Sequence, residues 1–231
     1  MEKEKLNQII LISVFIFFLG INSVYFYINL STSFNDNVYA FNELFINYQA
    51  GFIRRGLLGE VAWQLNNLFS IDPKTFFSLF FFIIYLLQIV LFFLIFKRYL
   101  VTKLIFFIII FSPSILLFHI YSPELFFLKD GLIKLTFLIH CFVFYEYFFL
   151  RKDKESYLRF LKFLIIPILF LVILIHEYQV FALSLHFLIS LGSVKEKKEL
   201  KKILKFYFPL IIPIFLIIIF FGNQLQFENL S

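Results

Sequence analysis

The chain has 231 residues and a formal net charge of +6, and 61% of its residues are hydrophobic, including 39 phenylalanines. Soluble proteins are roughly 45–50% apolar even when glycine is counted, so this composition excludes a soluble globular domain and predicts a protein built for the lipid bilayer. The basic residues fall in short clusters between apolar segments, which excludes a nucleic-acid-binding surface, and the single cysteine, Cys141, excludes a disulfide within one chain.

The first apolar segment, Ile9–Ile28, follows Lys3 and Lys5 and has the length of a membrane-spanning helix. A secretory signal peptide is the alternative. No pair of small residues in the Ala-x-Ala spacing follows, and the apolar pattern continues through Tyr25 and Tyr27, so the sequence favours an uncleaved first helix.

A long loop, residues 29–74, follows the first segment, and its second half has the pattern of an amphipathic helix over residues 55–69. At 100° per residue, the apolar residues of this stretch share one arc: Leu57, Leu58, Val61, Ala62, Leu65, Leu68 and Phe69. We expect this helix to lie in the membrane interface.

Two adjacent arginines, Arg54 and Arg55, precede this helix among three glycines, Gly51, Gly56 and Gly59. Guanidinium groups beside the free amides of a helix N-terminus make an anion site. The arginines therefore either anchor the loop on lipid head-group phosphates or hold the phosphate or diphosphate of a lipid-linked substrate.

Apolar segments at Phe76–Phe96, Leu104–Ile120 and Leu132–Leu150 predict the next spans. Before the last of them, Pro123 suits the first turn of a helix, and a helix from Pro123 to Leu150 would place Lys129 and Asp130 at the outer interface. The alternative is that these two residues cap the span and pair with each other. Within spans, we expect His140 and His186 to be core residues without a functional role and Glu146 to pair with Arg151 or Lys152.

The apolar block between Arg159 and Ser193 is interrupted by His176-Glu177 and flanked on both sides by basic clusters. Because both clusters prefer the cytoplasm, we expect two short spans, Phe160–Ile175 and Val180–Leu191, with a tight turn at residues 176–179. An ionisable pair at such a turn is costly unless it is used or paired, and partial burial would raise the pKa of Glu177 toward that of a general base. The alternative is a polar turn at the water boundary.

A last span, Ile203–Phe221, completes an all-α polytopic integral membrane protein of about seven transmembrane helices plus the interfacial helix, in one membrane domain over residues 1–231 that could be the N-terminal part of a longer protein. With the N-terminus cytoplasmic, sixteen of the 21 Lys and Arg residues lie inside, as expected for a bacterial inner (cytoplasmic) membrane protein. No metal-ligand spacing, Gly-rich phosphate loop or nucleophile motif is present, so no cofactor is expected, although a divalent metal could assist.

The run Asn47–Glu60 (NYQAGFIRRGLLGE), the later Phe127–Gly131 (FLKDG) and Ile175-His-Glu resemble multi-pass proteins of bacterial surface-polysaccharide gene clusters. These are O-antigen or capsule polymerases and, more broadly, membrane glycosyltransferases of the C superfold. The resemblance implies a site on the outer face, a polyprenyl-linked sugar donor, and an acidic catalytic residue in the first outer loop. That loop carries Asp36, Glu43 and Glu60 here. The chain departs from the family in being short and in lacking Asp-x-Asp.

We therefore expect a glycosyltransferase or polysaccharide polymerase that acts on a polyprenyl-diphosphate-linked saccharide, among membrane lipids and polysaccharide-assembly proteins. Arg54 and Arg55 would hold the diphosphate with help from Lys129, and Asp130 would be a further substrate-binding residue. Glu177 would be the base for the acceptor hydroxyl, and His176 would orient it or share its proton. Glu60 or Asp36 is the alternative acid or base. The rival functions are a transporter or flippase for lipid-linked oligosaccharide and a non-enzymatic membrane scaffold.

Overall fold

The computed structural model describes residues 2–31, 43–46, 56–98, 127–176, 178–216 and 219, and the regular structure in these ranges is helical. The predicted all-α fold is therefore confirmed. The chain divides into two compact units, Met1–Leu44 with Gln64–Gly131 (unit 1) and Phe45–Trp63 with Leu132–Ser231 (unit 2). The single domain over residues 1–231 stays a prediction.

Among the described residues, four helices are long and apolar enough to cross a membrane: Ile9–Ile28, Pro73–Ile95, Asp130–Leu150 and Lys154–Ile175. A shorter apolar helix covers Gln179–Leu191. These helices make the chain a polytopic membrane protein by length and composition. The count of seven spans stays a prediction, since Leu104–Ile120 and the end of Ile203–Phe221 lie outside the described residues.

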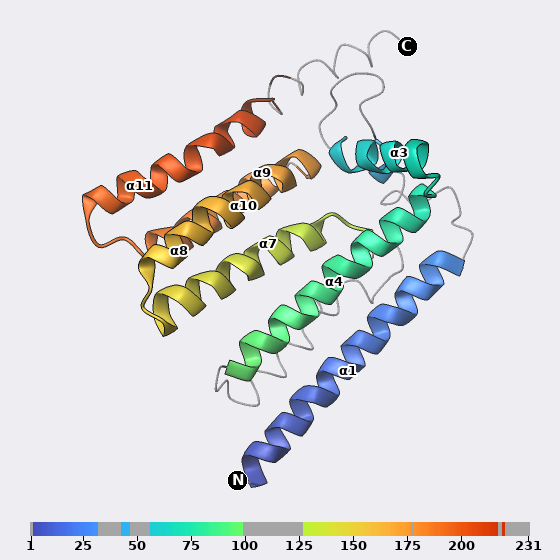
Figure 1. Cartoon of the computed structure of the whole chain (residues 1–231), viewed down its shortest axis with the longest axis horizontal. Helices are drawn as coiled ribbons and strands as arrows, with labels where there is room; N and C mark the ends of the chain where they lie inside the picture. The colour runs from blue at the N-terminus through green and yellow to red at the C-terminus, as the bar shows by residue number, and fades with distance from the viewer. Residues whose placement is uncertain are drawn as a thin grey trace. The chain divides into compact units, whose positions relative to one another are not determined.

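Unit 1 is built on two long helices, α1 (Glu2–Ser31) and α4 (Pro73–Arg98), which pack side by side (Figure 1). Two aromatic pairs show that the helices are antiparallel. The rings of Phe15 and Phe93 lie 4.9 Å apart, and those of Phe26 and Phe82 lie 4.7 Å apart. Between them the buried Asn22 donates from Nδ2 to the Phe82 carbonyl at 3.2 Å. Phenylalanine thus supplies much of the packing between these helices.

The start of α4 is set by Asp72, which accepts hydrogen bonds from the Thr75 amide at 3.0 Å and the Thr75 hydroxyl at 3.2 Å. Pro73 occupies the first helical position, where its missing N–H costs nothing. The Lys74 ammonium donates to the Leu30 carbonyl at 3.3 Å, at the negative end of the α1 dipole. The helix therefore begins three residues before the predicted Phe76.

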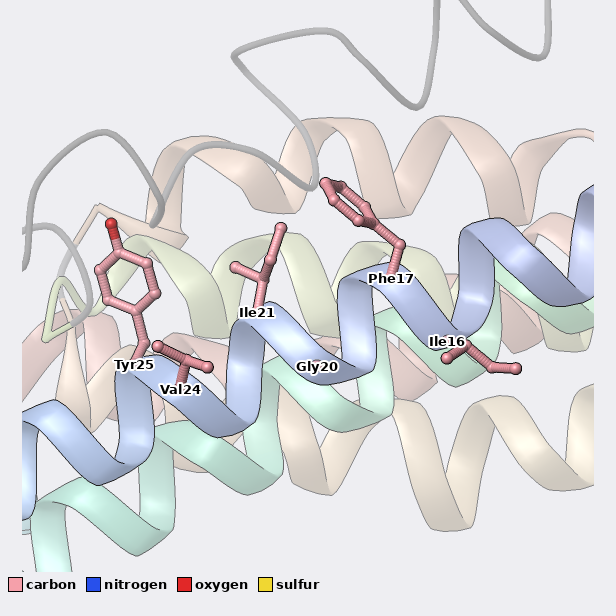
Figure 2. A pocket seen from close by; sticks show the side chains of 6 residues that line it. All are labelled: Ile16, Phe17, Gly20, Ile21, Val24 and Tyr25. Carbon is pink, nitrogen blue, oxygen red and sulfur yellow. The ribbon is translucent and has the colours of Figure 1, made fainter.

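The opposite face of α1 carries a shallow hollow over Gly20, lined by the apolar side chains of Ile16, Phe17, Ile21 and Val24 and by Tyr25 (Figure 2). A Cβ built at Gly20 meets no described atom within 4 Å. Ile16 and Val24 are more than half exposed. This face of α1 is therefore apolar and suited to contact with lipid or another helix.

Unit 2 contains most of α7 and the helices that follow it (Figure 1). Helix α7 (Asp130–Val143) continues as the π-helix η3 (Phe144–Leu150). One continuous rod, called the α8–α9 rod, is formed by α8 (Lys154–Phe160), η4 (Leu161–Ile165) and α9 (Ile166–Ile175). The remaining helices are α10 (Gln179–Leu191), α11 (Lys197–Tyr207) and η5 (Phe208–Leu210). Their core is formed by Val143, Tyr157, Leu158, Leu161, Ile165, Ile166, Leu169, Ile173, Ile203 and Leu210.

The predicted hairpin is confirmed, because α9 ends at Ile175, His176 is extended (φ −150°, ψ 105°) and α10 begins at Gln179. Its first limb is longer than predicted, however. The helix begins at Lys154 instead of Phe160, because the Asp153 carboxylate accepts the Ser156 amide at 3.0 Å and caps the helix there. The expectation of two short limbs is therefore wrong for the first.

A continuous helix from Pro123 to Leu150 is also excluded. Phe127 and Lys129 lie in a turn, in which the Gly131 amide donates to the Leu128 carbonyl at 3.2 Å, and α7 begins only at Asp130. Helix α7 and η3 together still have the length of a span. Near its end, the predicted pairing of Glu146 is confirmed, since Arg151 reaches its carboxylate at 2.9 Å.

Helices α8 and α11 are joined by an ion pair between Lys154 and Glu199, and Glu199 also accepts the Lys195 amide at 2.7 Å. The hydrogen bond from Lys154 is the largest cause that lowers the pKa of Glu199 from 4.5 to about 2. A lowered carboxyl pKa stabilises the fold above pH 4.5, and this contribution is lost as the pH falls from 4.5 to about 2.

We therefore expect the thermal unfolding midpoint of the wild-type protein in detergent to fall across this pH window, modestly because Glu199 is solvated. The variant Glu199→Gln should have a lower midpoint at neutral pH and a smaller fall on acidification. Identical pH profiles for the two proteins would contradict the assignment.

Orientation can be tested by cysteine labelling on a Cys141→Ser background. Asn67 and Lys195 are both exposed, and the basic clusters predict them to lie outside and inside, respectively. Ser193 is a poor probe because it is buried and donates to the Ser190 carbonyl at 2.7 Å. We expect Asn67→Cys to react with an impermeant thiol reagent in intact cells and Lys195→Cys to react only after permeabilisation. The reverse pattern would overturn the predicted orientation.

Candidate functional site

The residues predicted to form the site are only partly within the described ranges. Outside them lie Asp36, Arg54, Arg55 and Glu177. Those described are Glu60 on α3, Lys129 and Asp130 in unit 1, and His176 in unit 2. The shared cavity expected for the arginines, Lys129 and Glu177 therefore stays a prediction.

The predicted interfacial helix is present as α3 (Leu57–Phe69), and Glu60 lies half-exposed in its first turn. The expected apolar arc is buried only in part. Leu58 and Ala62 are buried, whereas Leu68 and Phe69 are about 70% exposed, at 71% and 68%. A helix with an exposed apolar end is suited to an interface with lipid. Arg54 and Arg55 directly precede this helix in the sequence.

Lys129 has a structural partner. Its side chain is 3% exposed, and its ammonium donates to the Glu43 carbonyl at 3.3 Å, which ties the turn before α7 to η1 (Glu43–Phe45). One residue on, Asp130 opens α7, and the buried Gln88 donates to the Gly131 carbonyl at 2.8 Å. This geometry favours the alternative interpretation, in which Lys129 and Asp130 have a structural role at the end of a span. It fits less well with a Lys129 side chain that binds substrate.

The break between α9 and α10 buries polar groups inside an apolar hairpin. His176 is 7% exposed, its amide donates to the Val172 carbonyl at 2.8 Å, and the Tyr178 ring packs edge-on against it with centroids 5.2 Å apart. The Gln179 side chain is fully buried, and the backbone amide of Gln179 donates to the His176 carbonyl at 3.0 Å. Both side chains flank Glu177 in the sequence, so the break is where this hairpin can do polar chemistry.

From Gln179 a line of buried polar side chains runs between the helices of unit 2. We call it the polar chain; its members are Gln179, His186, His140, Tyr157, Ser190 and Tyr207. The first link joins Gln179 Nε2 to His186 Nε2 at 3.3 Å, and the second joins the two histidine Nδ1 atoms at 3.0 Å. The histidine rings stack with an interplanar angle of 10°.

The polar chain continues toward the far end of α10. His140 Nε2 lies 3.1 Å from the Tyr157 hydroxyl, which donates to Ser190 Oγ at 3.2 Å. Ser190 Oγ in turn donates to the His186 carbonyl at 3.1 Å and lies 3.0 Å from the Tyr207 hydroxyl. Five of the six members are fully buried: Gln179, His186, His140, Tyr157 and Ser190.

These contacts assign each histidine a definite neutral tautomer, with the proton on Nε2 in His140 and on Nδ1 in His186. The Tyr157 hydroxyl donates to Ser190, so it accepts from His140 Nε2–H. His140 Nδ1 is then an acceptor, takes a proton from His186 Nδ1–H, and leaves His186 Nε2 to accept from Gln179. Every link thus has one donor and one acceptor without any charge, which suits a membrane interior.

His140 and His186 were expected to be core residues without a functional role, although the sequence carries a signal of the polar chain. Gln179, His186 and Ser190 are separated by seven and four residues, so they share one face of α10. A polar stripe on an otherwise apolar helix indicates a buried polar seam.

Among the described residues, no three His, Cys, Asp or Glu side chains are grouped as metal ligands. No protein-family model, curated protein or solved structure matches the chain.

Proposed function

We propose that this chain is a membrane glycosyltransferase or polysaccharide polymerase that acts on a polyprenyl-diphosphate-linked saccharide at the outer face of the bacterial inner membrane, with its N-terminus cytoplasmic. In this proposal Glu177 removes the proton from the acceptor hydroxyl and His176 positions Glu177. Arg54 and Arg55, just before α3, hold the diphosphate. Glu60 and Asp36 are the alternative acid or base.

The observation that supports this proposal most is the polar break in an apolar hairpin. Between the apolar helices α9 and α10, His176 and Gln179 are at least nine-tenths buried on either side of Glu177. Burying such groups in a membrane protein is costly unless they are used or paired. Glu177 stands between them in the sequence, and a carboxylate is a suitable general base for a sugar hydroxyl.

A second feature of the break also favours a hydroxyl-bearing ligand. Gln179 bonds to His186 through Nε2, whereas its buried Oε1 accepts no hydrogen bond from any described residue. A buried amide oxygen needs a donor, and a saccharide carries several hydroxyl donors.

The test is a reconstitution of the purified protein in nanodiscs with a polyprenyl-diphosphate-linked oligosaccharide. We expect saturable donor binding and the appearance of longer lipid-linked glycans or of transferred glycan, read out by mass spectrometry. Donor binding without product would exclude the transfer step. Absence of donor binding would overturn the proposal and favour the scaffold.

A transporter or flippase for the same lipid-linked oligosaccharide is the second candidate, favoured by one observation. The polar chain extends along α10 from the break to Ser190, so polar groups continue through the apolar helices of unit 2. A path for a polar head group across the membrane requires such a seam. Proteoliposomes that move a fluorescent lipid-linked saccharide between leaflets at a rate above protein-free vesicles would select this function.

A further inference from the structure

Unit 2 contains a groove between the middle of the α8–α9 rod, at residues 162–171, and α11 with η5. Its volume is about 760 Å³, within the usual range of ligand pockets. Three lysines, Lys162, Lys202 and Lys205, line the groove together with apolar side chains that include Phe170, Leu171 and Phe206. None of these residues belongs to the polar chain or to the break.

The groove has a basic end and an apolar end. The α8–α9 rod and α11 run in the same direction (Figure 1), and η5 packs against α9. On the rod, Lys162 precedes Phe170 by eight residues, or about 12 Å of helix. On α11, Lys202 and Lys205 precede Phe206 and Pro209. Both walls therefore present their lysines at one end and apolar side chains beyond them.

Proline shapes both walls. Pro167 has no N–H, and just before it the helix widens to the π-helix η4, in which the Ile166 amide donates to the Leu161 carbonyl five residues back. Pro209 stands in the 3-10 turn η5, where it cannot donate to the Lys205 carbonyl. Lys162 lies in the widened stretch itself. Local π-helices are frequent at functional sites because they displace a side chain from the regular helical row.

The charge of the groove is positive. Lys202 has the exposed Glu155 carboxylate at 3.6 Å, a solvated contact of little strength. The Lys162 ammonium lies over the Phe163 ring at 4.6 Å. The nearby Glu199 is engaged by Lys154 and by the backbone at the start of α11. Three cations facing one carboxylate leave a net charge of about two to be matched by a ligand.

We propose that this groove binds a lipid that carries a terminal phosphate or diphosphate, with the head group on the three lysines and the start of the chain along Phe170, Leu171 and Phe206. A terminal phosphate carries about −1.5 to −2 charges at pH 7, which matches the groove better than the single charge of a phosphodiester lipid. A long apolar tail fits the apolar end. This inference does not depend on the transfer reaction, because binding is measured without an acceptor.

The test uses polyprenyl phosphate as the probe, added to the purified protein in nanodiscs of phosphatidylcholine and measured by native mass spectrometry and by competition with a fluorescent analogue. The test variant is Lys162→Gln, Lys202→Gln, Lys205→Gln. The matched control is Lys195→Gln, Lys197→Gln, Lys201→Gln, which removes the same charge from exposed positions that do not line the groove. Thermal unfolding in detergent verifies that both variants are folded.

Each lysine near an anionic lipid contributes about fivefold to affinity, so the groove variant should bind polyprenyl phosphate on the order of 100-fold more weakly and the control within about fivefold of wild type. Leu171→Trp, which fills the apolar end and keeps every charge, should weaken polyprenyl phosphate and leave the weak binding of inorganic pyrophosphate unchanged. Equal losses in the groove and control variants, or equal competition by phosphatidylglycerol, would overturn the proposal, because either result indicates attraction to anionic lipid in general.

Discussion

Replacement of Glu177 by glutamine is expected to lower glycan transfer by about 10²–10⁴-fold, the usual contribution of a general base, while donor affinity stays near that of wild type. Glutamine keeps the size and polarity of the side chain and removes only its ability to accept a proton from the acceptor hydroxyl. The measurement is the single-turnover rate of product formation in nanodiscs, with donor binding measured on the same preparation. Full turnover by Glu177→Gln would remove this residue from catalysis.

Two variants control this experiment. Glu4→Gln makes the same chemical change near the start of α1 and should leave the rate unchanged. Arg54→Lys keeps the charge and loses the bidentate geometry toward a diphosphate, so it should weaken donor binding before it affects the rate constant of the bound donor. If Glu177→Gln and Arg54→Lys reduced binding and rate in the same proportion, the separate roles assigned to them would be wrong.

Tyr157→Ala is expected to destabilise unit 2 by about 3–5 kcal/mol, the usual cost of deleting a fully buried aromatic side chain. Tyr157 is 0% exposed, lies in the core of unit 2 and joins His140 to Ser190 in the polar chain. Tyr157→Phe removes only the hydroxyl and should cost about 1 kcal/mol, since hydrogen bonds between membrane helices contribute little each.

The free energy of unfolding is measured in mixed micelles by titration with a denaturing detergent. Phe181→Ala deletes an aromatic ring that is 75% exposed and should change the stability little. An unfolding midpoint of Tyr157→Ala equal to that of wild type would mean that Tyr157 does not hold the helices of unit 2 together.

The helical fold and the hairpin could be predicted from the sequence, because bilayer spans need a minimum apolar length and basic clusters mark one side of the membrane. Element boundaries were predicted less well. Counting apolar residues placed a helix start at Phe160, whereas the Asp153 cap and the solvated lysines and arginines of the first turns place it at Lys154. The turn before Asp130 was missed because Pro123 suggested an earlier start.

The candidate site was predicted only in part. The buried break at His176 could be predicted, since a polar interruption between two apolar segments is visible in one dimension. The partner of Lys129 could not be predicted, because it is the backbone carbonyl of Glu43, which is distant in the sequence. Every residue has a backbone carbonyl, so the residue type does not reveal this contact. The polar chain requires α7, α8, α10 and α11 to be placed against one another, whereas the polar stripe in the sequence reveals only the members on α10.

Photocrosslinking with a polyprenyl-diphosphate-linked saccharide that carries a diazirine on its sugar tests the central claim most directly, namely that the break between α9 and α10 receives the substrate. After irradiation in nanodiscs and digestion, the labelled peptides are identified by mass spectrometry. We expect the main label at residues 176–179, a second label at residues 54–60, and loss of both when unlabelled donor is in excess. Competed labelling that avoids residues 176–179 would contradict the proposed site.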